Sequence, residues 1–312
     1  MTVTYLVGDV FDRLAEIPDQ TVDLVVTSPP FLALRSYLPE DHPDKSREIG
    51  SEANPAEFLN VMLNVTSELR RVLAPHGSIA IELGDTYSGS GGAGGDYLEG
   101  GQRDGQESFT GAGRRDKTGW PLSKSKALIP ELYRVALAYG INPLTGADSP
   151  AGRWLVRNVV TWCRPNPAVG ALGDKWRPAT SDIVVACLSP KRYWDDVATR
   201  QPLLGDRETT LSTGAPLLDW WVVSTAGYKG SHYAVMPEKI VAPLVEAACP
   251  PGGVVLDPFA GTGTTLAVAA GHGYNAIGID LDGRNVDLAV ERIGGLFMAV
   301  KSRGEKYVAD IV

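Results

Sequence analysis

The sequence predicts an open α/β fold, in which helices flank a central sheet. Short apolar runs typical of buried strands alternate with segments whose apolar residues recur at helical spacing. Two of these runs end in conspicuous turns, a proline-rich one at 27–31 and a glycine-rich one at 257–265. Because open α/β sheets bind ligands at the carboxyl ends of their strands, both turns are candidates for a site. The 312 residues, 44% of them hydrophobic, suffice for one large α/β domain with insertions or for two domains.

The glycine-rich turn reads DPFAGTGTT and predicts a strand, a tight turn and a helix. It follows the apolar run 254–256 and precedes the apolar run 266–270. Gly261 and Gly263 allow a positive φ and let the backbone come close to a ligand. The free N–H groups at the start of the following helix would point at whatever lies over the turn.

The proline-rich turn reads TSPPF and follows the apolar run 22–26. Two consecutive prolines, Pro29 and Pro30, can neither continue a strand ladder nor enter the middle of a helix. They fix a short loop at the carboxyl end of a strand, so that the side chains on either side are held rigidly.

The two turns together resemble motifs of amino-methyltransferases that act on DNA bases. TSPPF is similar to that family's catalytic loop, and DPFAGTGTT is similar to its S-adenosylmethionine (AdoMet) loop. Because the catalytic loop comes first in this chain, the order resembles the β group of N4-cytosine and N6-adenine DNA methyltransferases. The resemblance implies a circularly permuted Rossmann-like methyltransferase fold, with a seven-stranded, mostly parallel sheet and helices on both faces.

Two further segments are similar to the same family. The run WCRPNP at 162–167 resembles a strand end of the family, with Arg164 where the family has lysine. The segment 231–239 resembles an element that packs beside AdoMet and contains a histidine. The resemblance divides the chain into a catalytic half at 1–87, a flexible glycine-rich loop at 88–119, a continuation of the sheet at 120–169, a target-recognition region at 170–227 and an AdoMet-binding half at 228–312.

Apolar spacing gives the expected elements in order. Strands are expected near 4–7, 22–26, 78–83, 154–162, 182–188, 254–256 and 276–280, and helices near 10–17, 55–73, 128–139, 240–248 and 283–296. The strand 254–256 should be central, beside 22–26 and 276–280, with the N-terminal strand beyond 276–280. No pattern is convincing over 170–227, and the tail from Ser302 is polar. The loop 88–119, with eleven glycines among 32 residues, cannot bury much surface and is either a linker or a segment that orders on DNA.

The resemblance implies AdoMet as cofactor and carries over a set of binding residues. The acidic residue at the end of strand 276–280 lies about 20 residues past the glycine turn and suits hydrogen bonds to ribose hydroxyls. Asp280 is the first choice for this role, and Asp282 is the second. Asp9 is either a helix N-cap or a residue near the adenine, and Asp85 is expected to face the same cleft. The implied cofactor residues are Asp9, His232, Asp257, Phe259, Ala260, Gly261, Thr262, Gly263, Thr264 and Asp280.

The catalytic loop implies direct methyl transfer to an extruded base. The Ser28 hydroxyl and the Pro29 carbonyl would accept hydrogen bonds from the exocyclic amine, and Phe31 would stack on the base. Pro29 and Pro30 keep both acceptors rigid, so that little reorganisation is needed during the reaction. No cysteine lies in a Pro-Cys loop, which argues against cytosine C5 methylation.

Serine at position 28 favours N4 of cytosine as the methylated atom, because aspartate in this loop usually accompanies adenine in the family. DNA N6-adenine methylation is the near alternative. An RNA or protein amide methyltransferase is less favoured, since those enzymes usually carry the AdoMet loop first. A non-catalytic DNA-binding protein with this fold is disfavoured because both loops are intact.

The charge distribution is compatible with a DNA partner, although the net charge is −8. Basic residues exceed acidic ones in 101–126 and 151–207, and such local surfaces can hold phosphates. Cations and aromatic side chains also alternate near Trp176 and Trp194, as on a base-reading surface or in ordinary packing. The candidate DNA-binding residues are Arg114, Arg115, Lys117, Arg177 and Arg192.

The remaining composition adds several expectations. The three cysteines have no metal-ligand spacing and no signal peptide or apolar run of membrane-spanning length is visible, so no metal, no membrane and a cytoplasmic location are expected. The resemblance implies a prokaryotic or phage-encoded enzyme that acts on double-stranded DNA as a monomer or dimer. A cognate restriction endonuclease acting independently is a possible partner.

Overall fold

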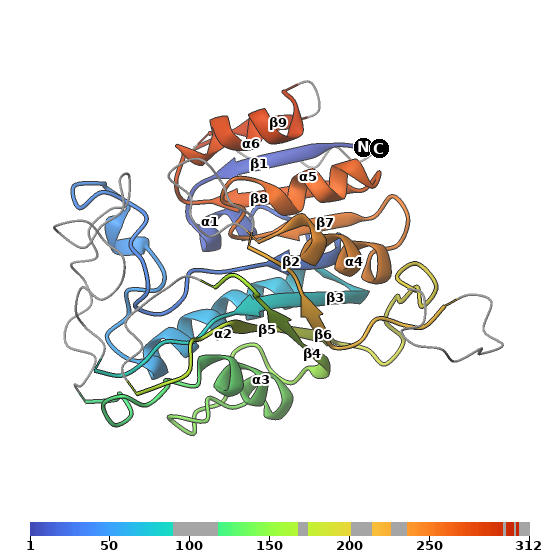
Figure 1. Ribbon diagram of the computed structural model, residues 1–312. Coiled ribbons are helices and arrows are strands. Elements are labelled where there is room, and N and C mark those ends of the chain that lie inside the picture. The colour runs from blue at the N-terminus through green and yellow to red at the C-terminus, as the bar shows by residue number, and fades with distance from the viewer. Residues whose placement is uncertain are drawn as a thin grey trace.

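A single sheet forms the centre of the computed structural model (Figure 1). Residues 1–89, 118–167, 174–200, 214–225, 236–295, 298–302 and 304–305 are described. Within them the sheet has nine strands in the order β6-β4-β5-β3-β2-β7-β8-β1-β9. The strands are β1 (Val3–Val7), β2 (Val22–Thr27), β3 (Leu73–Leu83), β4 (Leu155–Cys163), β5 (Thr180–Cys187), β6 (Trp220–Val222), β7 (Val254–Asp257), β8 (Asn275–Asp280) and β9 (Met298–Lys301).

The sheet is mostly parallel, and β5 is the strand that runs against its neighbours. It pairs antiparallel with β3 and with β4, whereas the six other pairings are parallel. The predicted neighbours are confirmed, because β7 lies between β2 and β8, and β1 lies beyond β8. The central strands are apolar and buried on both faces, as expected for a parallel sheet that is covered on both sides.

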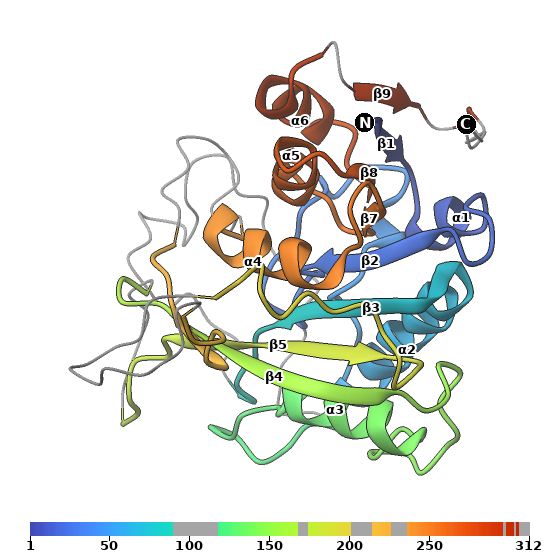
Figure 2. The same ribbon diagram turned by 90° about the vertical axis from the view of Figure 1, so that its right-hand side faces the viewer.

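Helices cover both faces of the sheet (Figure 2). One apolar cluster joins the sheet to α1 (Val10–Leu14), α2 (Pro55–Val72) and α3 (Ile129–Tyr139). A second cluster, on the other face, joins it to α4 (Glu238–Ala248), α5 (Thr264–Gly271) and α6 (Asn285–Ile293). A short 3₁₀ turn, η1 (Lys45–Arg47), lies in the segment between β2 and α2. None of the helices in the described ranges is long and apolar enough to cross a membrane.

Nine strands are found where seven were expected, and both additional strands are short edge strands. β6 has three residues and lies in the stretch 170–227, where no pattern was convincing. β9 has four residues, and each of these strands pairs with a single neighbour. Runs of three or four residues are too short to show an alternation of apolar and polar side chains, which explains why the sequence did not reveal them.

Local signals set the helix starts that border the central site. The Asn54 side chain accepts hydrogen bonds from the N–H groups of Ala56 and Glu57, both at 3.0 Å, and Pro55 occupies the first turn of α2. Asp9 likewise caps α1 by accepting from the N–H groups of Phe11 and Asp12.

A buried hydrogen bond joins the two strands that carry the predicted loops. β2 and β7 are parallel neighbours, so the proline-rich and glycine-rich turns leave the same edge of the sheet. The Thr27 hydroxyl donates to the Asp257 carboxyl at 2.6 Å, and both side chains are buried. Burial raises the pKa of Asp257 to about 6, and hydrogen bonds from Thr27, Thr265 and the Phe259 N–H oppose that rise.

We expect Asp257→Asn to flatten the pH dependence of stability between about pH 4 and pH 7. Because the folded-state pKa of Asp257 lies above its unfolded value, this group stabilises the fold below pH 4, and that contribution is lost as pH rises through about 6. Its full amplitude is at most about 3 kcal/mol. Urea unfolding of both proteins across this pH range measures it, with exposed Asp287→Asn as a matched control. Parallel profiles for the wild type and Asp257→Asn would contradict the assignment.

Candidate active site

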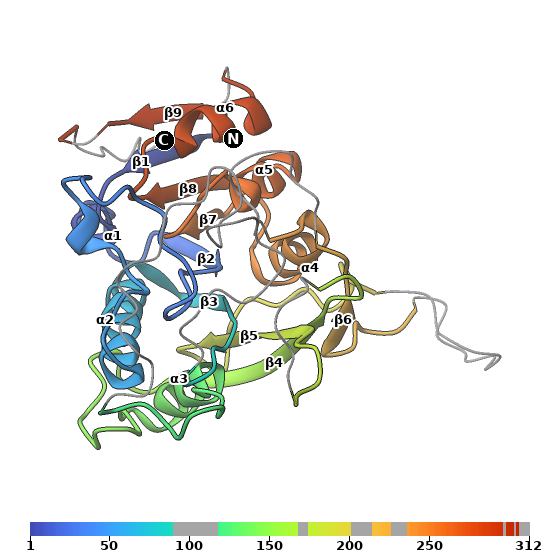
Figure 3. The ribbon, with the colours of Figure 1, turned by 60° about the vertical axis from the view of Figure 1, so that its left-hand side comes forward.

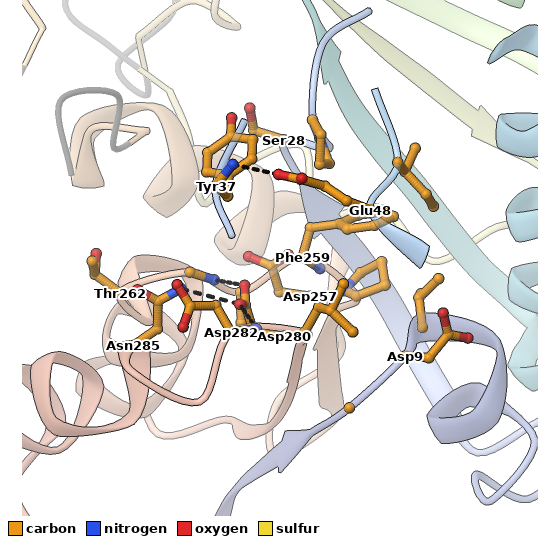
Figure 4. Close-up of a pocket in the computed structure, with 18 of the residues that line it drawn as sticks. Asp9, Ser28, Tyr37, Glu48, Asp257, Phe259, Thr262, Asp280, Asp282 and Asn285 are labelled. Atoms are coloured by element: carbon orange, nitrogen blue, oxygen red, sulfur yellow. Dashed lines mark hydrogen bonds between the residues drawn. The ribbon is translucent and has the colours of Figure 1, made fainter. Parts of the chain in front are cut away.

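One pocket lies at the carboxyl edge of the sheet and is lined by both predicted loops (Figure 4). The proline-rich loop contributes Ser28 and Pro30, and the glycine-rich loop contributes residues of 257–265. Other walls come from the start of α1, from the segment before α2 and from the turn after β8. The two distant motifs therefore open onto a single crevice, as the sequence predicted.

The glycine-rich turn is fastened to the end of β8 by the half-buried carboxylate of Asp280. The Gly261 N–H donates to Asp280 at 2.8 Å, and the other oxygen of Asp280 accepts from the Asp282 N–H and the Asn285 amide. Gly261 and Gly263 have φ values of 50° and 75°, which favour glycine. Burial raises the pKa of Asp280 to about 6. Hydrogen bonds from the Asp282 and Gly261 N–H groups lower the pKa and so oppose part of that rise.

The pocket has an acidic lining and two buried polar atoms without a partner in the described structure. Its carboxyl groups come from Asp9, Glu48, Asp257, Asp280 and Asp282. The Thr262 hydroxyl and the Asn285 carbonyl oxygen are buried and have no hydrogen-bond partner. A ligand with positive charge and with hydrogen-bonding groups fits such a lining, because a buried polar atom is costly when it is left unpaired.

The wall facing the glycine-rich turn is the segment between β2 and α2, which Figure 3 shows beside α1. Glu48 accepts a hydrogen bond from the Tyr37 N–H and pairs with Lys45 at 2.8 Å. The Arg284 guanidinium, paired with Asp282, donates to the Tyr37 carbonyl at 2.7 Å. These contacts attach the segment to the turn after β8 and hold it over the pocket.

The hydroxyl of Ser28 donates to the buried carboxylate of Glu82 on β3 at 2.5 Å. Burial raises the pKa of Glu82, although hydrogen bonds from Ser181 and Ser28 and the charges of Arg164 and Arg35 oppose that rise. Arg164 donates to the Ser181 hydroxyl at 2.9 Å, and its guanidinium lies 4.0 Å from Glu82. The Ser28 hydroxyl is therefore oriented by the Glu82 carboxylate, which is itself held in place by Arg164 and Ser181.

The sequence interpretation missed Glu82, although the sequence carried a signal for it. Glu82 is a single ionisable side chain within an otherwise apolar strand, in the run IAIEL at 79–83. A buried carboxylate needs partners, and here the partners are Ser28 of the proline-rich loop and the Arg164–Ser181 pair. Glu48, Arg47 and Asn285 were also missed. Glu48 and Arg47 lie in a segment without a recognisable pattern, and Asn285 begins the expected helix α6, whose spacing did not show that its first side chain faces a pocket.

The ring of Phe31 lies against Gly84, the first residue after β3. A β-carbon at Gly84 would come within 2.4 Å of the Phe31 ring, so that only glycine leaves room for it. On the other side, the carbonyl of Gly50, whose φ is 100°, accepts from the Ala33 N–H at 2.7 Å. Pro29 is buried and Pro30 is half-buried, and the loop is fixed between two glycines.

Most of the predicted cofactor residues are brought to this pocket. Those that line it are Asp9, Asp257, Phe259, Ala260, Gly261, Thr262, Thr264 and Asp280. Asp282, the second choice for the ribose role, lines it as well. Asp9 also lies 3.7 Å from Arg47, a cation that lines the pocket. Gly263 forms the start of α5, and a β-carbon there would lie 3.0 Å from Ala289. His232 lies outside the described residues.

Other predicted positions are not part of the pocket. Asp85 was expected to face the cleft. Instead it accepts hydrogen bonds from the N–H groups of Leu128 and Ile129 and so caps the start of α3. Arg177 is exposed and donates to the Pro167 carbonyl, at the same sheet edge as Ser28. Of the remaining candidate DNA-binding residues, Arg114, Arg115 and Lys117 lie outside the described ranges.

Arg192 is placed at the opposite edge of the sheet from Ser28. It follows the carboxyl end of β5, which pairs with the amino end of β3, and the next residue, Tyr193, bonds to the His76 carbonyl at 2.8 Å. The yellow segment after β5 in Figure 1 lies on that side. The Arg192 guanidinium lies 4.2 Å from the centre of the Trp194 ring.

No group of three or more His, Cys, Asp or Glu side chains is placed to hold a metal ion within the described part of the chain. The three cysteines are free.

Several curated methyltransferases are similar to this chain over most of its length. The chain is 29% identical over 296 residues to the Type II methyltransferase M.Cfr9I of Citrobacter freundii, covering 94% of this chain and 88% of that one. It is 29% identical over 291 residues to M.SmaI of Serratia marcescens, covering 92% and 89%. It is 42% identical over 302 residues to M.HinfI of Haemophilus influenzae, covering 93% and 68%.

Solved structures share the fold. PvuII DNA methyltransferase (cytosine-N4-specific) superposes with a TM-score of 0.63 at 15% identity, over 94% of this chain and 86% of that one. The putative DNA modification methylase TTHA0409 of Thermus thermophilus, solved in complex with S-adenosyl-L-methionine, gives a TM-score of 0.55 at 22% identity, over 96% and 99%. The family model for DNA methylases of the N6/N4 type matches residues 22–291. Because that match spans most of the 312 residues of this chain, the chain belongs to the family of N6/N4-type DNA methylases.

Proposed function

We propose that this protein transfers a methyl group from AdoMet to an exocyclic amino nitrogen in double-stranded DNA, with N4 of cytosine as the preferred atom. The observation that carries the proposal is the Ser28 hydroxyl, which lines the pocket formed by both family motifs and is hydrogen-bonded to Glu82. Family membership supports the reaction class, and relatives named Type II methyltransferases support DNA as substrate.

The chemistry of the pocket fits AdoMet. When bound, AdoMet supplies an activated methyl group on a positively charged sulfonium. The acidic lining suits that charge, and Asp280, which lines the pocket, would accept hydrogen bonds from ribose hydroxyls. The unpartnered Thr262 hydroxyl and Asn285 carbonyl oxygen would gain partners from the polar groups of such a ligand.

Ser28, Pro29 and Phe31 would hold the target base. Because the Ser28 hydroxyl donates to Glu82, its lone pairs are left to accept a hydrogen bond from the amine. The Pro29 carbonyl accepts a second bond, which favours a pyramidal nitrogen with its lone pair directed at the methyl group. Phe31, fixed against Gly84, presents a flat surface on which an extruded base can stack.

Glu82 is suited to receive the proton that the amine loses after methylation. Burial raises its pKa, so it binds a proton more readily than an exposed glutamate does. The proton would pass from the amine to the Ser28 hydroxyl, which hands its own proton to Glu82. Arg164 and Ser181 keep the carboxylate in position throughout.

The choice of cytosine rests on serine at position 28. N6 of adenine is the second candidate, because the matching family includes both kinds of enzyme. An independently acting endonuclease that cuts the same sequence is part of the proposal, since the relatives are named Type II methyltransferases.

The deciding experiment incubates the purified protein with AdoMet and unmethylated bacterial DNA and identifies the modified nucleoside by mass after digestion. N4-methylcytosine is the expected product, and sequencing of the same DNA gives the modified site. N6-methyladenine would overturn the cytosine preference. The absence of any modified base under conditions in which the protein binds AdoMet would overturn the proposed function.

Ser28→Ala should slow methyl transfer by about a hundredfold or more, because the amine loses an acceptor and its route to Glu82. Glu82→Gln should also slow it and should remove the low-pH fall in rate, since glutamine cannot take the proton. Single-turnover rates across pH measure both effects. AdoMet affinity should be unchanged in both variants, and Ser67→Ala on α2 serves as the control. Full activity of Ser28→Ala would exclude this role.

AdoMet should bind more weakly as the pH is lowered through about 6. The Asp280 carboxyl has a pKa of about 6, and ribose hydroxyls donate to its ionised form. The dissociation constant should therefore rise about tenfold for each pH unit below that value. Calorimetric titration at several pH values tests this expectation. Asp280→Asn should bind more weakly at neutral pH with a flatter profile, and an unaltered profile would assign the titration to another group such as Asp257.

A further inference from the structure

Two large apolar side chains stand almost fully in solvent at the active-site edge of the sheet. Trp176 is 95% exposed and Leu122 is 86% exposed, the highest values for large apolar residues in the described ranges. They lie on two neighbouring segments, because Lys124 and Asp174 form an ion pair at 3.1 Å between those segments. A single exposed apolar residue needs no explanation, but two on adjoining segments beside a pocket form a candidate contact surface.

Both segments are anchored to the stretch that continues β3 beyond Glu82. The Lys124 N–H donates to the Ser88 carbonyl and the Ala127 N–H donates to the Thr86 carbonyl, both at 2.9 Å. On the other side, the Lys175 ammonium lies 3.6 Å from the centre of the Tyr87 ring. The exposed side chains are therefore held on a hydrogen-bonded support that begins at the catalytic strand.

Trp176 is also close to the catalytic residues along the chain. It precedes Ser181 by five residues, and Ser181 bonds to Arg164 beside Glu82. Even a fully extended chain of that length spans only about 17 Å, which is roughly the length of five stacked base pairs along the duplex axis. A duplex whose extruded base reaches Ser28 would therefore pass within reach of Trp176.

The charge around these side chains complements a nucleic acid. Residues 118–127 and 174–180 contain four cations, Lys124, Lys126, Lys175 and Arg177, and one carboxylate, Asp174. This local excess of positive charge contrasts with the net charge of −8 for the chain. At the opposite sheet edge, the exposed Trp194 is followed by two acidic residues, Asp195 and Asp196. Phosphates are attracted to a surface with such an excess of cations.

We propose that Trp176 and Leu122 form the apolar contact of this protein with duplex DNA, and that Trp176 enters the base stack beside the extruded base. The four cations hold the flanking phosphates. An aromatic side chain in the stack replaces part of the stacking that is lost when a base leaves it, and so lowers the cost of extrusion. The inference rests on the proposed DNA methylation and adds the residues that open the duplex.

The test compares Trp176→Ala, Trp176→Phe and the wild type on a duplex that carries the mapped methylation site. A second duplex places the target base opposite an abasic site, so that the base is already unpaired. Trp176→Ala should slow single-turnover methylation of the paired duplex about tenfold or more and should approach the wild-type rate on the unpaired one. Trp176→Phe should keep most of the activity, and Leu122→Ala should show a smaller loss on the paired duplex.

Trp194→Ala is the matched control, an exposed tryptophan at the opposite edge whose loss should change neither rate. Wild-type methylation of the paired duplex by Trp176→Ala would overturn the proposal, and so would an equal loss on both duplexes. If Trp176→Ala kept wild-type methylation but lost binding to another protein, the surface would be a protein-binding site and the proposal would be overturned. Unfolding of Trp176→Ala would contradict the exposed position of the ring. Failure of the wild type to methylate any DNA would instead refute the proposed function.

Discussion

The arrangement of the whole site depends on the parallel pairing of β2 with β7, completed by the buried hydrogen bond from Thr27 to Asp257. The pairing brings together two loops that lie more than 200 residues apart in the sequence. The hydrogen bond satisfies a carboxyl group that would otherwise be costly to bury at this position. The glycine-rich turn and the proline-rich turn therefore open onto one crevice, because their strands are parallel neighbours and end at the same edge of the sheet.

The site combines two electrostatic environments that are built by different parts of the sheet. On the side of β7 and β8, carboxyl groups predominate and suit a cationic ligand. On the side of β3 and β5, Glu82 is balanced by Arg164 and Ser181 and presents the Ser28 hydroxyl. Each side is stabilised by contacts of its own, so the pocket is largely formed before any ligand arrives.

The sequence predicted the central fold well because the central strands and the amphipathic helices are long and regular. It also predicted the two loops, since glycine and proline restrict the backbone in recognisable ways. It could not reveal Glu48 or Arg284, because their roles depend on contacts between segments that have no period. Arg192 could not be placed from the sequence either. The mixture of cations and aromatic residues around it resembles a DNA-facing surface, but the direction of β5 places it at the sheet edge opposite Ser28.

Gly84 limits the movement of the Phe31 ring in a way that the motif alone does not convey. The Phe31 ring rests directly on backbone, with no compressible side chain between them. The ring can move toward Gly84 only if the backbone that follows β3 moves with it. The orientation of the Phe31 ring is thus set by the end of a central strand as well as by the loop that carries it.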